Sequence, residues 1–219
     1  MAKYMIHTMP KRKWYVDEYL IPSMIKQGVD KGDILVYNDI DRAGNLKAFI
    51  NACLQLLNDE NGTWHLQDDI VISSRFTTVT DRNDKGIVCG FKSEYDGMKP
   101  AGMVDLKQMW FSFLCIRIPH KIARECANWI KDYIIGNPIY KEWWEQGVND
   151  DMLFRKFLEQ HYSDSSILNL NPNIVDHIDY LIGGTVNSNA REVTQIRSKL
   201  WEDEDVVKEL EKQLKEAGK

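Results

Sequence analysis

The sequence has no apolar run of about 18 residues, the length needed to cross a membrane, so no membrane span is expected. We also find no charged-then-apolar secretion signal, no internal repeat and no low-complexity linker. The net charge of −5 argues against a broad basic surface for nucleic acid. It leaves open a local basic pocket for one phosphorylated ligand. These absences predict a soluble protein of the cytoplasm.

Cysteine is scarce, and none of the four residues forms a CxxC pair. Cys53, Cys89, Cys115 and Cys126 are widely separated, and each lies among apolar residues. We therefore expect buried free thiols rather than a zinc site, in a reducing compartment.

The composition is that of a globular protein. The 219 residues include 43% hydrophobic residues, which can supply a core, and 28% charged residues, which can cover it. Seven Trp and nine Tyr are many for this length, and such rings both fill cores and stack on sugars or bases. We expect one domain over residues 1–199 and a charged amphipathic helix over residues 200–219.

Short apolar runs alternate with helical patterns in the first half of the chain. Strands are expected at 4–8, 34–37 and 63–66, with helices over 14–27 and 45–57 between them. This order implies a parallel sheet with right-handed crossovers. The predicted fold class is therefore α/β, with a Rossmann-like, mostly parallel central sheet flanked by helices and a C-terminal helical tail.

The second half is less regular. Further strands are expected at 87–91 and 109–118, a loop over 92–105, and helices over 119–134 and 152–161. In the tail, four apolar residues share one face of a helix that packs on the domain or on a partner, which leaves a homo-oligomer open. They are Val206, Val207, Leu210 and Leu214.

Two adjacent acids, Asp68 and Asp69, directly follow the third expected strand. Ligands of parallel sheets bind at the carboxyl ends of the strands, which is where this pair lies. Neighbouring carboxylates are costly after an apolar run unless water or a cation neutralises them, and their oxygens are natural ligands for Mg²⁺ or Mn²⁺. Asp is equally favoured in turns and helix caps, so the spacing alone leaves both readings open.

The segment Trp64-His65-Leu66-Gln67-Asp68-Asp69-Ile70 resembles the strand and acidic motif of GT-A glycosyltransferases, the DxD signature or its xDD variant. The resemblance implies a GT-A-like domain in which Asp69 binds the divalent ion, Mn²⁺ or Mg²⁺, that holds the nucleotide diphosphate. Gln67 stands where the family has its first acid, and its amide is a weaker metal ligand that is expected to bond the ribose. Asp68 is expected to support either role.

Three upstream segments follow the order of the family's nucleotide contacts. Residues 7–12 end the first expected strand, where the family binds its nucleobase, and residues 38–39 end the second, where it often places an acid on the base or ribose. Residues 41–47 are similar to its loop-to-helix segment at the nucleotide, and a helix N-terminus suits a diphosphate. Ordinary helix capping also explains a Gly-Asn pair there. The residues so implied are Thr8, Pro10, Arg12, Asp39, Gly44, Asn45 and Lys47.

Residues 171–178 are similar to a Pro-x-x-Val-x-His segment near the end of some GT-A enzymes, including bacterial and procollagen galactosyltransferase-like ones. The resemblance implies that His177 completes the metal site or contacts the diphosphate, and imidazole is a good ligand for Mn²⁺ beside carboxylates. A lone His is otherwise more often structural. The likeness covers residues 4–190 and is most specific at 64–70 and 172–177.

An inverting transferase needs a carboxylate that takes the proton from the attacking hydroxyl. The resemblance implies Asp150 or Asp151, at the start of an expected helix, although a helix cap accounts for both equally well.

The resemblance thus implies metal-dependent transfer of a sugar from a nucleoside-diphosphate sugar, first of all a UDP-sugar, to a hydroxyl. The acceptor would be a saccharide, a protein or a modified nucleobase, in a bacterial or phage-infected host cell. A nucleotidyltransferase normally has a Gly-rich loop near its first strand, and residues 8–13 contain no glycine. A non-catalytic binding protein of the same fold is the other alternative, because of Gln67.

Overall fold

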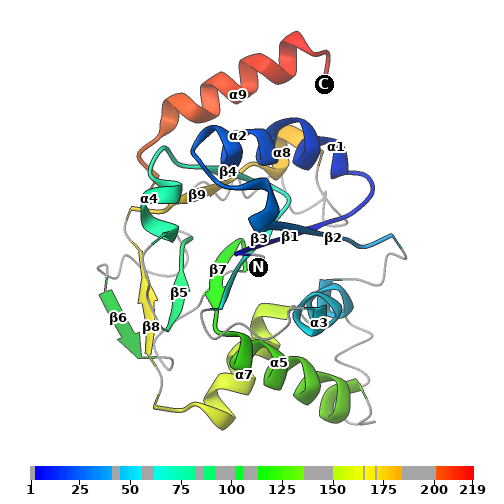
Figure 1. Cartoon of the computed structure of the whole chain (residues 1–219), viewed down its shortest axis with the longest axis vertical. Helices are drawn as coiled ribbons and strands as arrows, with labels where there is room; N and C mark the ends of the chain where they lie inside the picture. The colour runs from blue at the N-terminus through cyan, green and yellow to red at the C-terminus, as the bar shows by residue number, and fades with distance from the viewer. Residues whose placement is uncertain are drawn as a thin grey trace.

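The structure is a computed structural model, and Figure 1 shows the whole chain. Within the described residues, seven strands form one mixed sheet and two short strands form a second. The described residues are 3–40, 45–55, 62–81, 86–91, 102–105, 113–135, 150–164, 166–170, 172–183 and 201–219.

The first three strands form the parallel part of the large sheet. β1 (Tyr4–Thr8) lies between β2 (Ile34–Asn38) and β3 (Thr63–Gln67) and is parallel to both. β1 and β3 are almost wholly buried because helices or a second sheet cover both faces, which explains why they appear in the sequence as apolar runs. The three expected strands and their parallel pairing are confirmed.

Four more strands complete the sheet in the order β2-β1-β3-β7-β5-β8-β6. They are β7 (Cys115–Ile118), β5 (Ile87–Cys89), β8 (Ser166–Asn169) and β6 (Gly102–Asp105). Only β7 and β6 run against the other five strands. The predicted α/β class, with a mostly parallel sheet flanked by helices, is therefore confirmed.

The loop expected over residues 92–105 is wrong in its last part. β6 pairs there with β8 as an antiparallel edge strand, although Gly97, Pro100 and Gly102 indicated turns. Pairing with β8 supplies the backbone hydrogen bonds of this segment, so weak local propensity does not prevent a strand. Residues 92–101 lie outside the described residues.

One face of the sheet is covered by a continuous helical segment made of α1 (Lys13–Tyr15), η1 (Val16–Leu20) and α2 (Ile21–Lys26). The middle part is a π-helical turn in which the N–H of Ile21 donates to the carbonyl of Val16. Pro22, which follows at once, has no N–H to continue the α-helical pattern, and the wider turn accommodates it. Beyond the helix, Gly28 adopts a φ of 96°, which suits glycine.

The same face carries the small sheet, in which β4 (Ile70–Ile72) pairs antiparallel with β9 (Val175–His177). Three short helices belong to the loops: η2 (Lys31–Asp33), α4 (Phe76–Thr80) and α8 (Asp179–Ile182). The opposite face is covered by three packed helices (Figure 1). They are α3 (Asn45–Gln55), α5 (His120–Trp129), which continues as η5 (Ile130–Ile135), and α7 (Asp150–His161).

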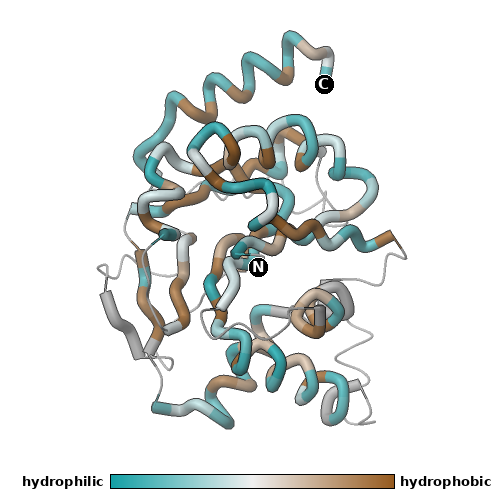
Figure 2. The backbone as a smooth tube through the Cα atoms, viewed as in Figure 1, coloured by the Kyte–Doolittle hydropathy of each residue, from teal (hydrophilic) through white to brown (hydrophobic). Residues whose placement is uncertain are grey.

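The C-terminal helix α9 (Glu204–Glu216) packs on its own domain. Val207, Leu210 and Leu214 are buried in the core cluster that also contains residues of η1 and α2, and Figure 2 shows hydrophobic positions recurring along the helix. At the end of the chain, Lys219 pairs with Glu18. Of the two placements expected for the tail, the structure shows packing on the domain.

Two further expectations can be compared with the described residues. The four cysteines are buried thiols, as expected. Within the described ranges, no helix is both long and apolar enough to cross a membrane.

The packing of α9 predicts that Leu214→Ala lowers the free energy of unfolding by about 2–3 kcal/mol, because it removes a buried side chain and leaves a cavity. Urea denaturation followed by circular dichroism measures the change. Glu211→Ala is the matched control, since Glu211 is exposed on the same helix. Equal midpoints for the two variants would contradict the packing of α9 on the domain.

Candidate functional site

The carboxyl ends of β1, β2 and β3 meet at one edge of the sheet. Thr8 is in register with Asn38, and the N–H of Asp39 donates to the carbonyl of Thr8 over 2.8 Å. Gln67 ends β3, and the chain bends through Asp68 and Asp69 before β4 begins. The acidic pair therefore lies at the end of a parallel strand, as predicted, beside the ends of its two neighbours.

The small sheet brings His177 to the acidic pair. Ile70, directly after Asp69, is in register with His177, and the N–H of Ile178 donates to the carbonyl of Asp69 over 2.9 Å. Tyr15 holds β4 from the other side, since its hydroxyl donates to the carbonyl of Ile70. As a result, Nε2 of His177 lies 3.3 Å from Oδ2 of Asp69.

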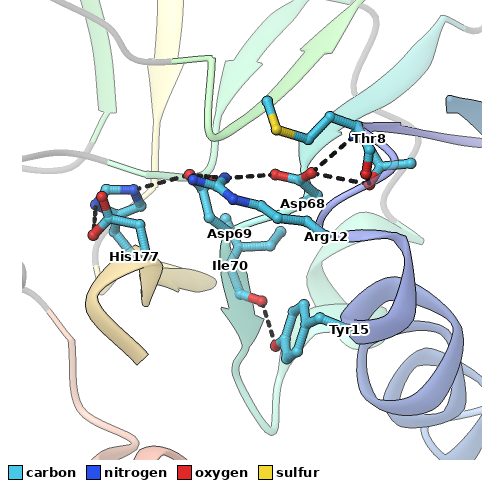
Figure 3. Close-up of polar contacts among 9 residues, drawn as sticks. Thr8, Arg12, Tyr15, Asp68, Asp69, Ile70 and His177 are labelled. Atoms are coloured by element: carbon cyan, nitrogen blue, oxygen red, sulfur yellow. Dashed lines mark hydrogen bonds and ion pairs between the residues drawn. The ribbon is translucent and has the colours of Figure 1, made fainter. Parts of the chain in front are cut away.

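Arg12 pairs with both acids (Figure 3). Its Nη1 donates to Oδ1 of Asp68 over 2.8 Å and to Oδ2 of Asp69 over 2.6 Å. The guanidinium reaches them from the turn between β1 and α1, and Arg12 is only 2% exposed. The resemblance implied that Arg12 contacts the nucleotide, whereas in the structure it neutralises the acidic pair.

The two carboxylates have different surroundings. Asp68 also accepts hydrogen bonds from the hydroxyl of Thr8 (2.9 Å) and the N–H of Met9 (3.2 Å), both at the end of β1. Three donors thus satisfy Asp68 internally. They fix the end of β1 to the bend formed by Asp68 and Asp69, which we call the acidic bend. In the described part of the chain, Oδ1 of Asp69 is buried without a hydrogen-bond partner.

The ionisation of the pair follows from these contacts. Burial alone would raise the pKa of Asp69, but His177 and Arg12 outweigh it and lower the pKa to about 2. Burial and the neighbouring charge of Asp69 raise the pKa of Asp68. Burial would lower the pKa of His177, but its hydrogen bond to Asp69 and the charges of Asp69 and Asp179 outweigh burial and raise it.

The residues present fit a divalent ion in part. A carboxylate and an imidazole are suitable ligands for Mn²⁺, and the unsatisfied Oδ1 of Asp69 is a buried acceptor that lacks a donor or a cation. Among the described residues, no three His, Cys, Asp or Glu side chains gather as a complete metal site. An ion bound by Asp69 and His177 would therefore take its other ligands from a substrate or from water.

The other predicted nucleotide-binding residues lie at or beyond the same edge. Pro10 is exposed in the turn after β1, and Asp39 and Gln67 are partly buried at the ends of β2 and β3. Asn45 is the first residue of α3 and Lys47 lies in its first turn, but their side chains are not described. Gly44 lies outside the described residues.

The predicted catalytic acids lie at the start of α7. Asp150 is its first residue, and its side chain is not described. Oδ1 of Asp151 accepts the N–H of Met152 over 2.7 Å, in keeping with a cap of the helix start. The helix packs on α3 and α5.

Sequence reasoning missed the interactions that hold this site together. The pairing of Arg12 with both acids left no signal in its spacing, because it depends on how the turn after β1 folds back. A second missed residue is Asp179, whose Oδ1 lies 3.7 Å from Nδ1 of His177. Its position two residues after His177 was the available signal, since a carboxylate commonly orients a ligating imidazole.

His7, one residue before Thr8 and partly buried, pairs with the buried His65 of β3. Nε2 of His7 and Nδ1 of His65 are 3.0 Å apart, so at least one ring must be neutral. Burial lowers the pKa of His7 to about 4, and burial together with the nearby His7 and His120 lowers the pKa of His65 well below its usual value. Their side chains contact Phe49 of α3.

Comparison with protein families finds no family model that matches this chain, and comparison with curated proteins finds no match either. Function is therefore inferred from the residues of the site and their geometry.

The histidine pair predicts a loss of stability in acid. His7 binds a proton near pH 6.5 in the unfolded chain but only near pH 4 in the folded protein. This difference in proton binding favours the fold above pH 6.5, and the stabilisation is lost as the pH falls towards 4. The loss amounts to about 3 kcal/mol at most for His7. Urea midpoints at several pH values measure it.

In His7→Gln, the decline of stability between pH 6.5 and 4 should be smaller than in the wild type. His161→Gln is the control, since His161 is exposed on α7 and should leave the decline unchanged. An unchanged decline in His7→Gln would show that the pair does not bind protons as described.

Proposed function

We propose that this chain is a metal-dependent glycosyltransferase of the GT-A type, which moves a sugar from a nucleoside-diphosphate sugar to an acceptor hydroxyl. The observation that carries the proposal is the contact between Asp69 and His177 at the carboxyl end of β3. The motif resemblance named these two residues, far apart in the sequence, as metal ligands of one site. The fold places them 3.3 Å apart beside an unsatisfied carboxylate oxygen.

The donor would lie along the edge formed by the ends of β1, β2 and β3. Asp69 and His177 would hold Mn²⁺ or Mg²⁺, and the N-terminus of α3 would face the diphosphate. The base and ribose would lie towards Thr8, Asp39 and Gln67. When bound, the ion would stabilise negative charge on the departing nucleoside diphosphate.

The acceptor side of the proposal involves the start of α7. For an inverting reaction, Asp150 or Asp151 would take the proton from the attacking hydroxyl. The cap contact of Asp151 leaves Asp150 as the first acid to substitute. The proposed acceptor is a saccharide, a protein or a modified nucleobase in a bacterial or phage-infected cell. The proposed donor is a UDP-sugar.

A non-catalytic binding protein is the second candidate, and one observation favours it. Arg12 already neutralises the acidic pair, so the fold does not depend on a metal ion to keep these carboxylates buried. Such a protein would bind its ligand without releasing nucleotide from a sugar donor.

Thermal stability in the presence of nucleoside diphosphates and sugar nucleotides, with and without Mn²⁺, tests the proposed donor site. A ligand at about 100 times its dissociation constant should raise the free energy of unfolding by about 2.7 kcal/mol. We expect this shift with one nucleotide, only with Mn²⁺, and not in Asp69→Ala, because the variant lacks the proposed metal ligand.

Asp164→Ala is the matched control, since Asp164 is an exposed acid in the turn after α7 and should keep the shift. Release of free nucleotide from the donor that binds then separates the transferase from the binding protein. If no nucleotide stabilises the well-folded wild type, the sugar-nucleotide proposal is wrong.

A further inference from the structure

Arg12 has the position and charge of an internal cation for the acidic bend. Its Nη1 lies between Oδ1 of Asp68 and Oδ2 of Asp69, at 2.8 and 2.6 Å. The side chains of the two acids are 7% and 10% exposed, so water can screen little of this interaction. The guanidinium thus supplies positive charge at the same carboxylate that is proposed to bind the metal ion.

The pairing is not fully satisfied. In the described part of the chain, Nε and Nη2 of Arg12 and Oδ1 of Asp69 are buried without hydrogen-bond partners. Buried polar groups are rarely left unpaired, and a side chain that is nine-tenths buried with a free carboxylate oxygen suggests that a further ligand belongs there. Asp69 therefore has one oxygen bonded to Arg12 and one available to a cation.

We propose that Arg12 is the resident counter-ion of the acidic pair and competes with the divalent cation for Asp69, so that Arg12 sets the affinity of the metal site. The inference rests on the proposed function, because it assumes the same metal site. Arg12 is a positioning residue in this account, since it acts through Asp69.

The competition has a physical basis in charge and in the second partner of Arg12. A dication on Asp69 would lie within a few ångströms of the guanidinium, and like charges at such distances in a buried site repel strongly. Thr8 and Met9 hold Asp68 in place, so Asp68 can keep its pairing with Arg12 when Arg12 releases Asp69. The release therefore leaves no unpaired buried guanidinium.

The test is the binding of Mn²⁺ alone, followed by the electron paramagnetic resonance signal of the free ion at pH 8. We expect Arg12→Gln to bind Mn²⁺ about tenfold more tightly than the wild type, a factor that corresponds to about 1.4 kcal/mol. Arg75→Gln is the matched control, because Arg75 is an exposed arginine that contacts the carbonyl of Pro172 and not the acidic pair. Its affinity should equal that of the wild type.

The outcomes separate this inference from the proposed function. If the wild type binds Mn²⁺ measurably and Arg12→Gln binds it equally well or more weakly, the proposed competition is wrong. The proposed metal site is then retained. If neither protein binds Mn²⁺ at millimolar concentration, the metal site itself is overturned, and the competition with it.

A second measurement uses the unaltered protein, in case Arg12→Gln does not fold. The Nε–H resonance of Arg12 in the wild type is followed by nuclear magnetic resonance while Mg²⁺ is added. A shift of this resonance that saturates together with Mg²⁺ binding supports the competition. A resonance that stays in place while Mg²⁺ saturates the site overturns it.

Discussion

Two adjacent carboxylates are buried at the end of β3 because one guanidinium donates to both of them. Without Arg12, Asp68 and Asp69 would repel each other in surroundings that water reaches poorly, and removing one partner of a buried ion pair typically costs about 3–5 kcal/mol. The pairing also joins three parts of the chain, since Arg12 precedes α1, Asp68 binds the end of β1, and Asp69 leads into β4. The edge of the sheet is organised around this interaction.

The same interaction divides the work between the two acids. Asp68 accepts from Arg12, Thr8 and Met9, so its oxygens serve the structure. Asp69 keeps a free oxygen and faces His177 across the β4–β9 pair. Asp69 is thus the acid of this bend that keeps an oxygen for an external ligand, and the motif resemblance suggested a metal ion as that ligand.

The sequence was most informative where burial leaves a strong pattern. β1, β2 and β3 were predicted almost to the residue, because short, mainly apolar runs between polar turns favour strands, although β2 proved to be a partly buried edge strand. β4, β8 and β9 have three or four residues each and were not predicted, since such segments become strands only through long-range pairing. The motif resemblance could name Asp69 and His177 because both lie in local sequence patterns. The pairing of Arg12 with the acids could not be predicted, because it depends on how the turn after β1 folds.

The charge of the site favours an ion and a diphosphate that bind together. Asp68, Asp69 and Asp179 carry three negative charges and Arg12 one positive, which leaves two negative charges when His177 is neutral. A dication would neutralise this charge inside a poorly hydrated site, whereas a diphosphate alone would meet the negative charge and the free oxygen of Asp69. The ion would thus remove the repulsion that the diphosphate would otherwise meet. In the proposed competition, Arg12 would weaken the hold of Asp69 on the dication, and the anion of the diphosphate would offset that loss.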